Sequence, residues 1–150
     1  MSDLYKIIDD ITYLRQPCES VEYDEGMTLG KLLLEVLSTS KSGVGLAANQ
    51  IGIRKRVCVI NVNKPIILIN PRIIGGFEKI VFDEGCLSFT GEVVRTQRYK
   101  NILVKSDTNK SIMSFYGIDN SSLLESVCVQ HEIDHLNGIT MHDRQKEKIL

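Results

Sequence analysis

Two histidines and a glutamate stand close together in the stretch VCVQHEIDHLNG, residues 127–138. His131 and His135 are four residues apart, and Glu132 directly follows the first of them. On a helix, positions i and i+4 lie one turn apart, so both imidazoles can share one metal ion. Glu132 lies about 100° around the helix axis from His131 and would flank the metal without binding it. The pattern predicts a metal site that can activate water.

Two histidines do not complete such a site, because catalytic zinc-type sites usually take three protein ligands and keep a fourth position for water. His142 is a weak candidate near the end of the chain, and Asp134 is expected to face solvent. Cys86, in the loop DEGCLS, and Cys128, one turn before the first histidine, are better candidates because thiolate binds transition metals well. If both cysteines bound, the centre would be a closed, structural Cys2His2 site. If only Cys86 bound, Cys128 would be a small core residue.

The composition is that of an ordinary globular protein. The chain has 150 residues, 43% hydrophobic and 25% charged, which is enough for one domain with a core. A formal net charge of -1 without a basic cluster argues against nucleic-acid binding, and no apolar run reaches membrane-spanning length. The four cysteines form no CxxC pair, and the N-terminus has no secretory or transit pattern. We therefore expect one domain over residues 1–150, located in the cytoplasm.

The elements that must position these residues are predicted to form an α+β fold. Apolar residues at helical spacing predict a helix over residues 27–39. Strands are predicted at 56–62 and 65–71, followed by an extended segment from residue 75 and three short strands between residues 92 and 117. Ser122 and Glu125 fit a capping box that begins a second helix. This order predicts mostly antiparallel sheets around a central HExxH helix, with the N-terminal helix packed on them.

Three segments together resemble one known family. GVGLAANQIG (residues 43–52), EGCLS (84–88) and QHEIDH (130–135) resemble, in order and spacing, the signature motifs of the peptide deformylases, which are GxGLAAxQ, EGCLS and QHExxH. Three separate motifs in one short chain do not arise from composition. The similarity extends more weakly from the N-terminus to about Asp143.

The resemblance implies a metal-dependent hydrolase. Cys86, His131 and His135 would bind one divalent metal, typically Fe(II), which zinc, nickel or cobalt can replace; ligand chemistry alone would suggest zinc. The substrates would be N-formyl-methionyl nascent peptides, with release of formate. Glu132 would take a proton from the metal-activated water and pass it to the departing amine.

The same resemblance implies further contacts with the substrate. The Gln50 side chain and the backbone N–H of Leu87 would stabilise the oxyanion. The strand around Gly45 would pair with the substrate backbone. The full set of implied substrate-binding residues is Val44, Gly45, Phe82, Gly85, Leu124, Val127 and Cys128, although the apolar members, taken singly, are also typical of an ordinary core. Cys128 is therefore predicted to line the methionine pocket and not to be a fourth ligand. Glu84 and Arg98 match positions that form a supporting ion pair.

The chain departs from the family pattern at several positions. Asn49 stands where Thr or Pro is common, Thr90 stands where Pro is usual, and Val93 replaces an arginine near the substrate groove. Most family members continue with a long helix after HExxH. The chain is therefore expected to be a short form with a frayed tail over residues 141–150. It is also expected to be a monomer and to bind the ribosome weakly at most.

Two other classes of function are kept as alternatives. A zincin-like peptidase usually takes its third ligand downstream of HExxH, where only His142 is available. A protein with a structural Cys2His2 zinc, or a decoy that binds nascent peptides without cleaving them, is the non-enzyme alternative. The upstream EGCLS motif argues against the first, and the intact catalytic positions argue against the second.

Overall fold

The computed structural model describes residues 5–146, which form two antiparallel sheets and three α-helices. The elements in chain order are α1 (Ile11–Leu14), α2 (Tyr23–Leu37), β1 (Gly45–Ala47), the 3-10 turn η2 (Ala48–Ile51), β2 (Val57–Asn61), β3 (Pro65–Ile69), β4 (Arg72–Glu84), β5 (Val94–Lys105), β6 (Met113–Tyr116), α3 (Asn120–Leu136) and the 3-10 turn η3 (Met141–Arg144). None of the described helices is both long enough and apolar enough to cross a membrane.

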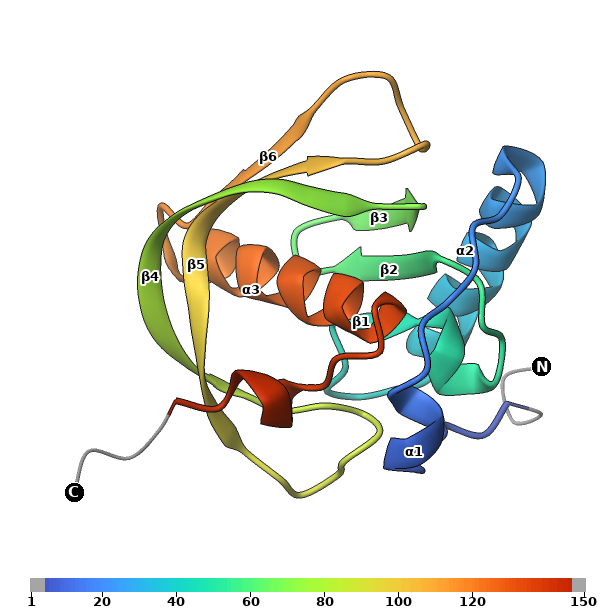
Figure 1. The fold of residues 1–150 in the computed structure, drawn as a ribbon, viewed down its shortest axis with the longest axis horizontal. Helices are drawn as coiled ribbons and strands as arrows, with labels where there is room; N and C mark the ends of the chain where they lie inside the picture. Colours follow the sequence, from blue (N-terminus) through green and yellow to red (C-terminus); the bar gives the residue numbers. More distant parts are fainter. Residues whose placement is uncertain (1–4, 147–150) are drawn as a thin grey trace.

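Helix α3 lies in the middle of the molecule and contacts both sheets (Figure 1). One sheet has the strand order β1-β2-β3, and the other has the order β4-β5-β6, in which β4 and β5 curve around one side of α3. Helix α2 packs against the first sheet. The predicted α+β fold, with antiparallel sheets around the HExxH helix and an N-terminal helix on them, is confirmed.

Strand β2 shows why the first sheet can hold a helix on each face. Its first four residues form the apolar run VCVI, and all four are buried. Because side chains alternate along a strand, Cys58 and Ile60 join the core around α3, whereas Val57 and Val59 join the core under α2. A continuous apolar run of this kind is typical of a strand that is covered on both faces.

Several element boundaries differ from the prediction. The first long helix begins at Tyr23, four residues before the predicted start, and the segment from residue 92 to 117 forms two strands and not three. Helix α3 is capped by Asp119, whose carboxylate accepts from the backbone N–H of Ser122 at 2.8 Å. The Ser122 hydroxyl accepts from the Asp119 N–H at 2.9 Å in return. The predicted cap at Ser122 was therefore wrong by three residues, because Ser122 is the N3 residue of a capping box that Asp119 begins.

The predicted frayed tail was also wrong for the residues that the structure describes. Met141 is buried, and the η3 turn that it begins packs beside β5. The backbone N–H of Lys146 donates to the carbonyl of Arg95 at 2.9 Å, which extends the contact between the tail and β5. Residues 147–150 lie outside the described part of the chain.

Candidate active site

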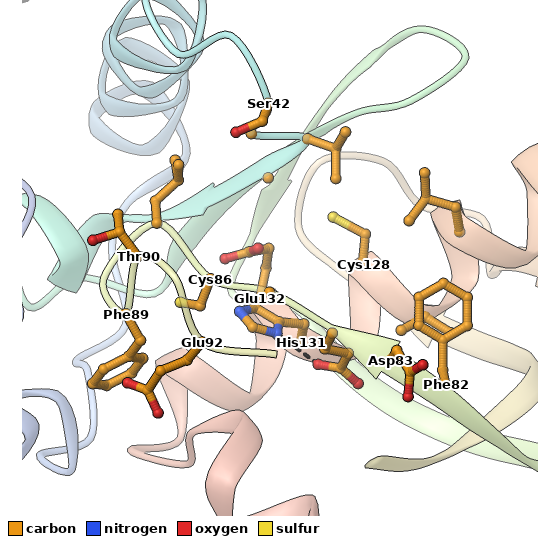
Figure 2. A pocket seen from close by; sticks show the side chains of 18 of the residues that line it. Ser42, Phe82, Asp83, Cys86, Phe89, Thr90, Glu92, Cys128, His131 and Glu132 are labelled. Carbon is orange, nitrogen blue, oxygen red and sulfur yellow. Dashed lines mark hydrogen bonds and ion pairs between the residues drawn. The ribbon is translucent and has the colours of Figure 1, made fainter. Parts of the chain in front are cut away.

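A cavity of about 450 Å³ opens where β1, the end of β4, the loop that follows it and α3 meet. Figure 2 shows Cys86, His131 and Glu132 between an end with Phe82 and an end with Phe89. Of the predicted site residues, those that line the cavity are Val44, Gly45, Gln50, Phe82, Gly85, Cys86, Leu87, Leu124, Val127, Cys128, His131 and Glu132. His135 is fully buried behind them. Residues from three separate segments of the chain, 44–50, 82–87 and 124–135, are thus brought to one place.

Three side chains that could hold a metal ion converge at this cavity. The ligand atoms of Cys86, His131 and His135 all lie within 4.8 Å of one another. His135 Nε2 lies 3.2 Å from His131 Nε2 and 3.4 Å from Cys86 Sγ. One sulfur and two nitrogens fit a divalent transition metal, and three protein ligands are the number that a catalytic site uses while it keeps a position for water.

Cys128 lines the cavity but is not part of this group of three. Burial raises the pKa of its thiol well above the usual value, and the nearby Glu132 carboxylate raises it further. A thiol in this environment stays protonated, and the protonated form is a poor metal ligand. His142 is not in the group either. Its Nε2 contacts Glu92 Oε1 at 2.9 Å, and its ring packs edge-on against Phe89 with centroids 4.7 Å apart.

Behind the cavity, Glu84 supports one of the histidines. Its Oε1 contacts His131 Nδ1 at 2.8 Å and accepts from Arg98 Nη2 at 2.9 Å, so the ion pair with Arg98 is present and buried. Burial would raise the pKa of Glu84, but hydrogen bonds from Arg98 and His131 outweigh this and lower it to about 2. The carboxylate therefore stays charged, and the contact leaves His131 Nε2 free to bind a metal.

The expectation that Asp134 faces solvent was wrong. Its side chain is buried and accepts from Arg98 Nη1 at 2.5 Å and from Arg144 Nε and Nη2, each at 3.0 Å. Every residue from Ser126 to Leu136 is buried, because sheets and loops surround this half of α3. A helix covered on all sides has no solvent-facing position, so a charged residue such as Asp134 needs partners of opposite charge.

Glu132 is buried, and its Oε1 has no hydrogen-bond partner among the described residues. Burial raises its pKa to about 7; Glu84 and Asp134 raise it too, while His131 and Arg98 oppose them. A carboxyl group with a pKa near neutrality can both accept and donate a proton under physiological conditions.

Strand β1 passes so close to α3 that only glycine fits at position 45. A Cβ atom there would lie 2.6 Å from Glu132 Oε2 and 2.6 Å from Cys128 Sγ. Gly45, the second glycine of the GVG segment, therefore lets the backbone of β1 lie against Glu132 at the cavity.

The η2 turn holds Gln50 beside the metal-binding group. Its Oε1 accepts from the Ala47 N–H at 2.9 Å. Its Nε2 donates to Ser88 Oγ at 3.0 Å and lies 3.6 Å from Cys86 Sγ. With one end of the amide fixed by backbone, the N–H₂ end points toward the proposed ligands.

The second wall of the cavity was not predicted from the sequence. Phe89, Thr90, Gly91 and Glu92 line it, and all four follow the EGCLS motif where the chain departs from the family pattern. The contact of Asn49 with the backbone of His135 was not predicted either. The cavity wall formed by residues 89–92 could have been found, because these residues closely follow Cys86 in the sequence. No local signal marks the contact of Asn49, which joins residues 86 positions apart.

Comparison with known proteins gives a consistent result. Residues 2–149 match the family model described as Polypeptide deformylase. The peptide deformylase of Hydrogenovibrio crunogenus is 39% identical over 134 residues, which are 83% of this chain and 75% of the relative. That of Desulfitobacterium hafniense is 42% identical over 122 residues, 79% of each chain.

Solved structures are similar as well. The crystal structure of the peptide deformylase from Thermotoga maritima matches with a TM-score of 0.79 and 33% identity, over 95% of this chain and 98% of that one. A peptide deformylase from Synechococcus elongatus in complex with actinonin matches with a TM-score of 0.80 and 32% identity, over 96% of this chain and 79% of that one.

Proposed function

The chain belongs to the polypeptide deformylase family, and from this premise we propose which residues carry out its reaction. It is a metal-dependent hydrolase that removes the N-formyl group from the N-termini of newly made polypeptides. The observation that carries the residue assignment is the convergence of Cys86, His131 and His135 beside Glu132.

We propose that these three ligands hold one divalent metal, Fe(II) in the native enzyme, with zinc, nickel or cobalt able to replace it. A metal bound there supplies a Lewis acid, which lowers the pKa of water and polarises a carbonyl group. The ligand set of one thiolate and two imidazoles supports a transition metal, and the choice of iron rests on the family resemblance.

Glu132 is the proposed proton carrier. It accepts a proton as water attacks the formyl carbon, and it returns the proton to the amine nitrogen when the formyl C–N bond breaks, so that formate and a free N-terminus leave. Its pKa of about 7 suits both steps. The Gln50 side chain and the Leu87 backbone N–H are the proposed donors to the oxyanion that forms in between.

The substrate is proposed to lie along β1. This strand is at the edge of its sheet, so one side of its backbone around Val44 and Gly45 can pair with an extended peptide. The methionine side chain would enter the apolar end of the cavity. The residues proposed to line that pocket are Val44, Phe82, Leu124, Val127 and Cys128. Gly85, which also lines the cavity, is proposed to contact the substrate outside that pocket.

Formate release from a formyl-Met-Ala-Ser peptide tests these roles. Wild-type protein loaded with iron under anaerobic conditions should release formate. Glu132→Gln should retain its metal and lose activity by about 10²–10⁴-fold, the usual contribution of a positioned general base. If Glu132→Gln kept wild-type activity, Glu132 would not be the proton carrier. Loss of activity in air with iron, and its persistence with nickel, would support iron as the native metal.

We further propose that residues 1–150 act as a single catalytic domain, as a cytoplasmic monomer with at most weak ribosome contact and no binding of nucleic acid. The core that α3 shares with both sheets supports one domain. Light scattering after size exclusion and co-sedimentation with ribosomes test the proposal. A stable dimer, or ribosome binding that resists salt, would contradict it.

A further inference from the structure

The two histidines proposed as ligands differ in what holds the second nitrogen of each ring. His131 Nδ1 contacts the Glu84 carboxylate at 2.8 Å. His135 Nδ1 is buried and has no partner among the described residues, while its Nε2 faces His131 and Cys86. Metal-binding histidines almost always donate their other N–H to an acceptor. His135 therefore needs an acceptor on the side of its ring that faces away from the metal.

Asn49 is a polar side chain that already reaches this residue. It is fully buried, and its Nδ2 donates to the backbone carbonyl of His135 at 2.9 Å. Its Oδ1 is buried without a partner. Within residues 5–146, the unpaired buried side-chain polar atoms are Asn49 Oδ1, His135 Nδ1 and Glu132 Oε1. The first two are an acceptor and a donor on residues that are in contact, and buried polar groups are rarely left unpaired.

The local fold explains why Asn49 points this way. Asn49 and Gln50 are consecutive residues of the η2 turn, and their side chains leave it in different directions. The Gln50 amide lies beside Cys86 Sγ, whereas the Asn49 amide reaches the last turn of α3 at His135. One short turn therefore contacts two of the three proposed ligands.

We propose that Asn49 is a positioning residue for the metal ligand His135, with one contact that is present in the structure and a second that forms when the metal is bound. The Nδ2 end fixes the carbonyl of residue 135, together with the N–H of Gly138 at 3.1 Å. Among residues 5–146, neither Oδ1 nor His135 Nδ1 has a hydrogen-bond partner in the structure. These two atoms would pair when the metal is bound at Nε2, and this pairing would select the tautomer that leaves Nε2 for the metal. The proposal rests on the metal assignment made above.

The test is the metal affinity of the folded protein. Zinc-loaded protein is titrated with a chromophoric chelator, and cobalt-loaded protein gives the visible absorption spectrum of the site. Asn49→Leu removes both ends of the amide and should weaken zinc binding about 10- to 100-fold, as loss of an outer partner typically does. It should also change the cobalt spectrum. Asn49→Asp keeps an acceptor and should retain most of the wild-type affinity.

Asn70→Gly is the matched control. The Asn70 amide also donates to a backbone carbonyl, that of Val21 at 2.8 Å, and glycine tolerates its positive φ of 48°. This variant should lose thermal stability without any change in zinc affinity or cobalt spectrum. Asn49→Ser, which cannot span both contacts, replaces Asn49→Leu if the leucine variant does not fold.

Two results overturn the proposal. One is wild-type zinc affinity and an unchanged cobalt spectrum in Asn49→Leu or Asn49→Ser, whatever their melting temperatures. The other is equal loss of affinity in Asn49→Asp and Asn49→Leu, which would deny a role to the acceptor. Two checks of the metal site run in parallel. The wild-type protein should release formate, and its cobalt–thiolate absorption should disappear in Cys86→Ser. If these fail, the proposed metal site is wrong, and the failure is not one of Asn49 alone.

Discussion

At the scale of single residues, Glu84 connects the proposed metal site to the buried charges behind it. It contacts His131 on one side and Arg98 on the other, and Arg98 also contacts Asp134. A buried ion pair stabilises little when compared with apolar packing, but removal of one partner leaves a charge without compensation. The pair therefore matters most when one member is neutralised by mutation or by acid.

We expect this pair to control acid stability. The pKa of Glu84 falls from an ordinary 4.5 to about 2 in the folded protein, so its carboxylate favours folding above pH 4.5. That contribution, about 3 kcal/mol, is lost as the pH falls from about 4.5 through about 2. Glu84→Gln should be less stable at neutral pH and should show a flatter dependence over this range. Urea unfolding of metal-free protein at several pH values measures this, and parallel curves for the two proteins would contradict it.

Residue types and their spacing predicted which residues of the candidate site lie together better than they predicted what surrounds those residues. His131, Glu132 and Cys86 were found because the motifs that hold them are short and local. The partners of Asp134 were missed because its burial depends on strands and a turn far along the chain, which helical periodicity cannot reveal. Residue type and spacing thus predict what a site can do, and tertiary packing decides what supports it.

At the scale of elements, η3 holds the loop that supplies Cys86. This loop, residues 85–93, joins β4 to β5 and forms one wall of the cavity. Glu92 and Phe89 from the loop both contact His142 of η3. Arg144 in turn fixes η3 to Asp134 of α3. His142, a weak candidate for the third metal ligand, therefore fastens the loop that carries Cys86, the proposed third ligand.

We predict that His142→Ala loosens this loop. The hydrogen bond between His142 and Glu92 contributes about 0.5–1.5 kcal/mol, and the edge-on aromatic contact with Phe89 contributes about as much. Because a loss of about 1.4 kcal/mol is a tenfold change, KM for a formyl-peptide should rise about tenfold. Amide hydrogen exchange in residues 87–92 should become faster, while zinc affinity stays the same. Lys55→Ala, which removes the exposed ion pair with Glu19 elsewhere on the surface, is the control. Unchanged exchange and KM in His142→Ala would show that the contact has no role in the loop.

The elements themselves were predictable to different degrees. The two long helices and the strands β2 and β3 have strong apolar patterns, and their existence was predicted correctly. The great length of β5 was missed because its sequence, VRTQRYKNILVK, is interrupted by charged residues, which lie on its exposed face or, as Arg98 does, meet a buried partner. The four-residue α1 is too short to show a helical period.

At the scale of the whole molecule, the proposed metal joins two parts of the chain that are far apart in the sequence. Cys86 belongs to the loop between β4 and β5, and the two histidines belong to α3. In the unfolded chain these residues are far apart and bind a metal weakly. A ligand that binds only the folded state stabilises it by an amount that grows with the ratio of its concentration to its dissociation constant.

Removal of the metal should therefore lower the melting temperature without loss of the fold. At a free zinc concentration 100 times the dissociation constant, the stabilisation is about 2.7 kcal/mol. For a chain of this size, this corresponds to a shift of roughly 5–10 °C. Scanning calorimetry with and without chelator measures the shift, and far-ultraviolet circular dichroism checks that the apo protein stays folded. Cys86→Ser should show a smaller shift, because it loses one ligand, whereas Glu132→Gln should keep the full shift. An equal shift in wild type and Cys86→Ser would mean that the metal binds elsewhere on the molecule.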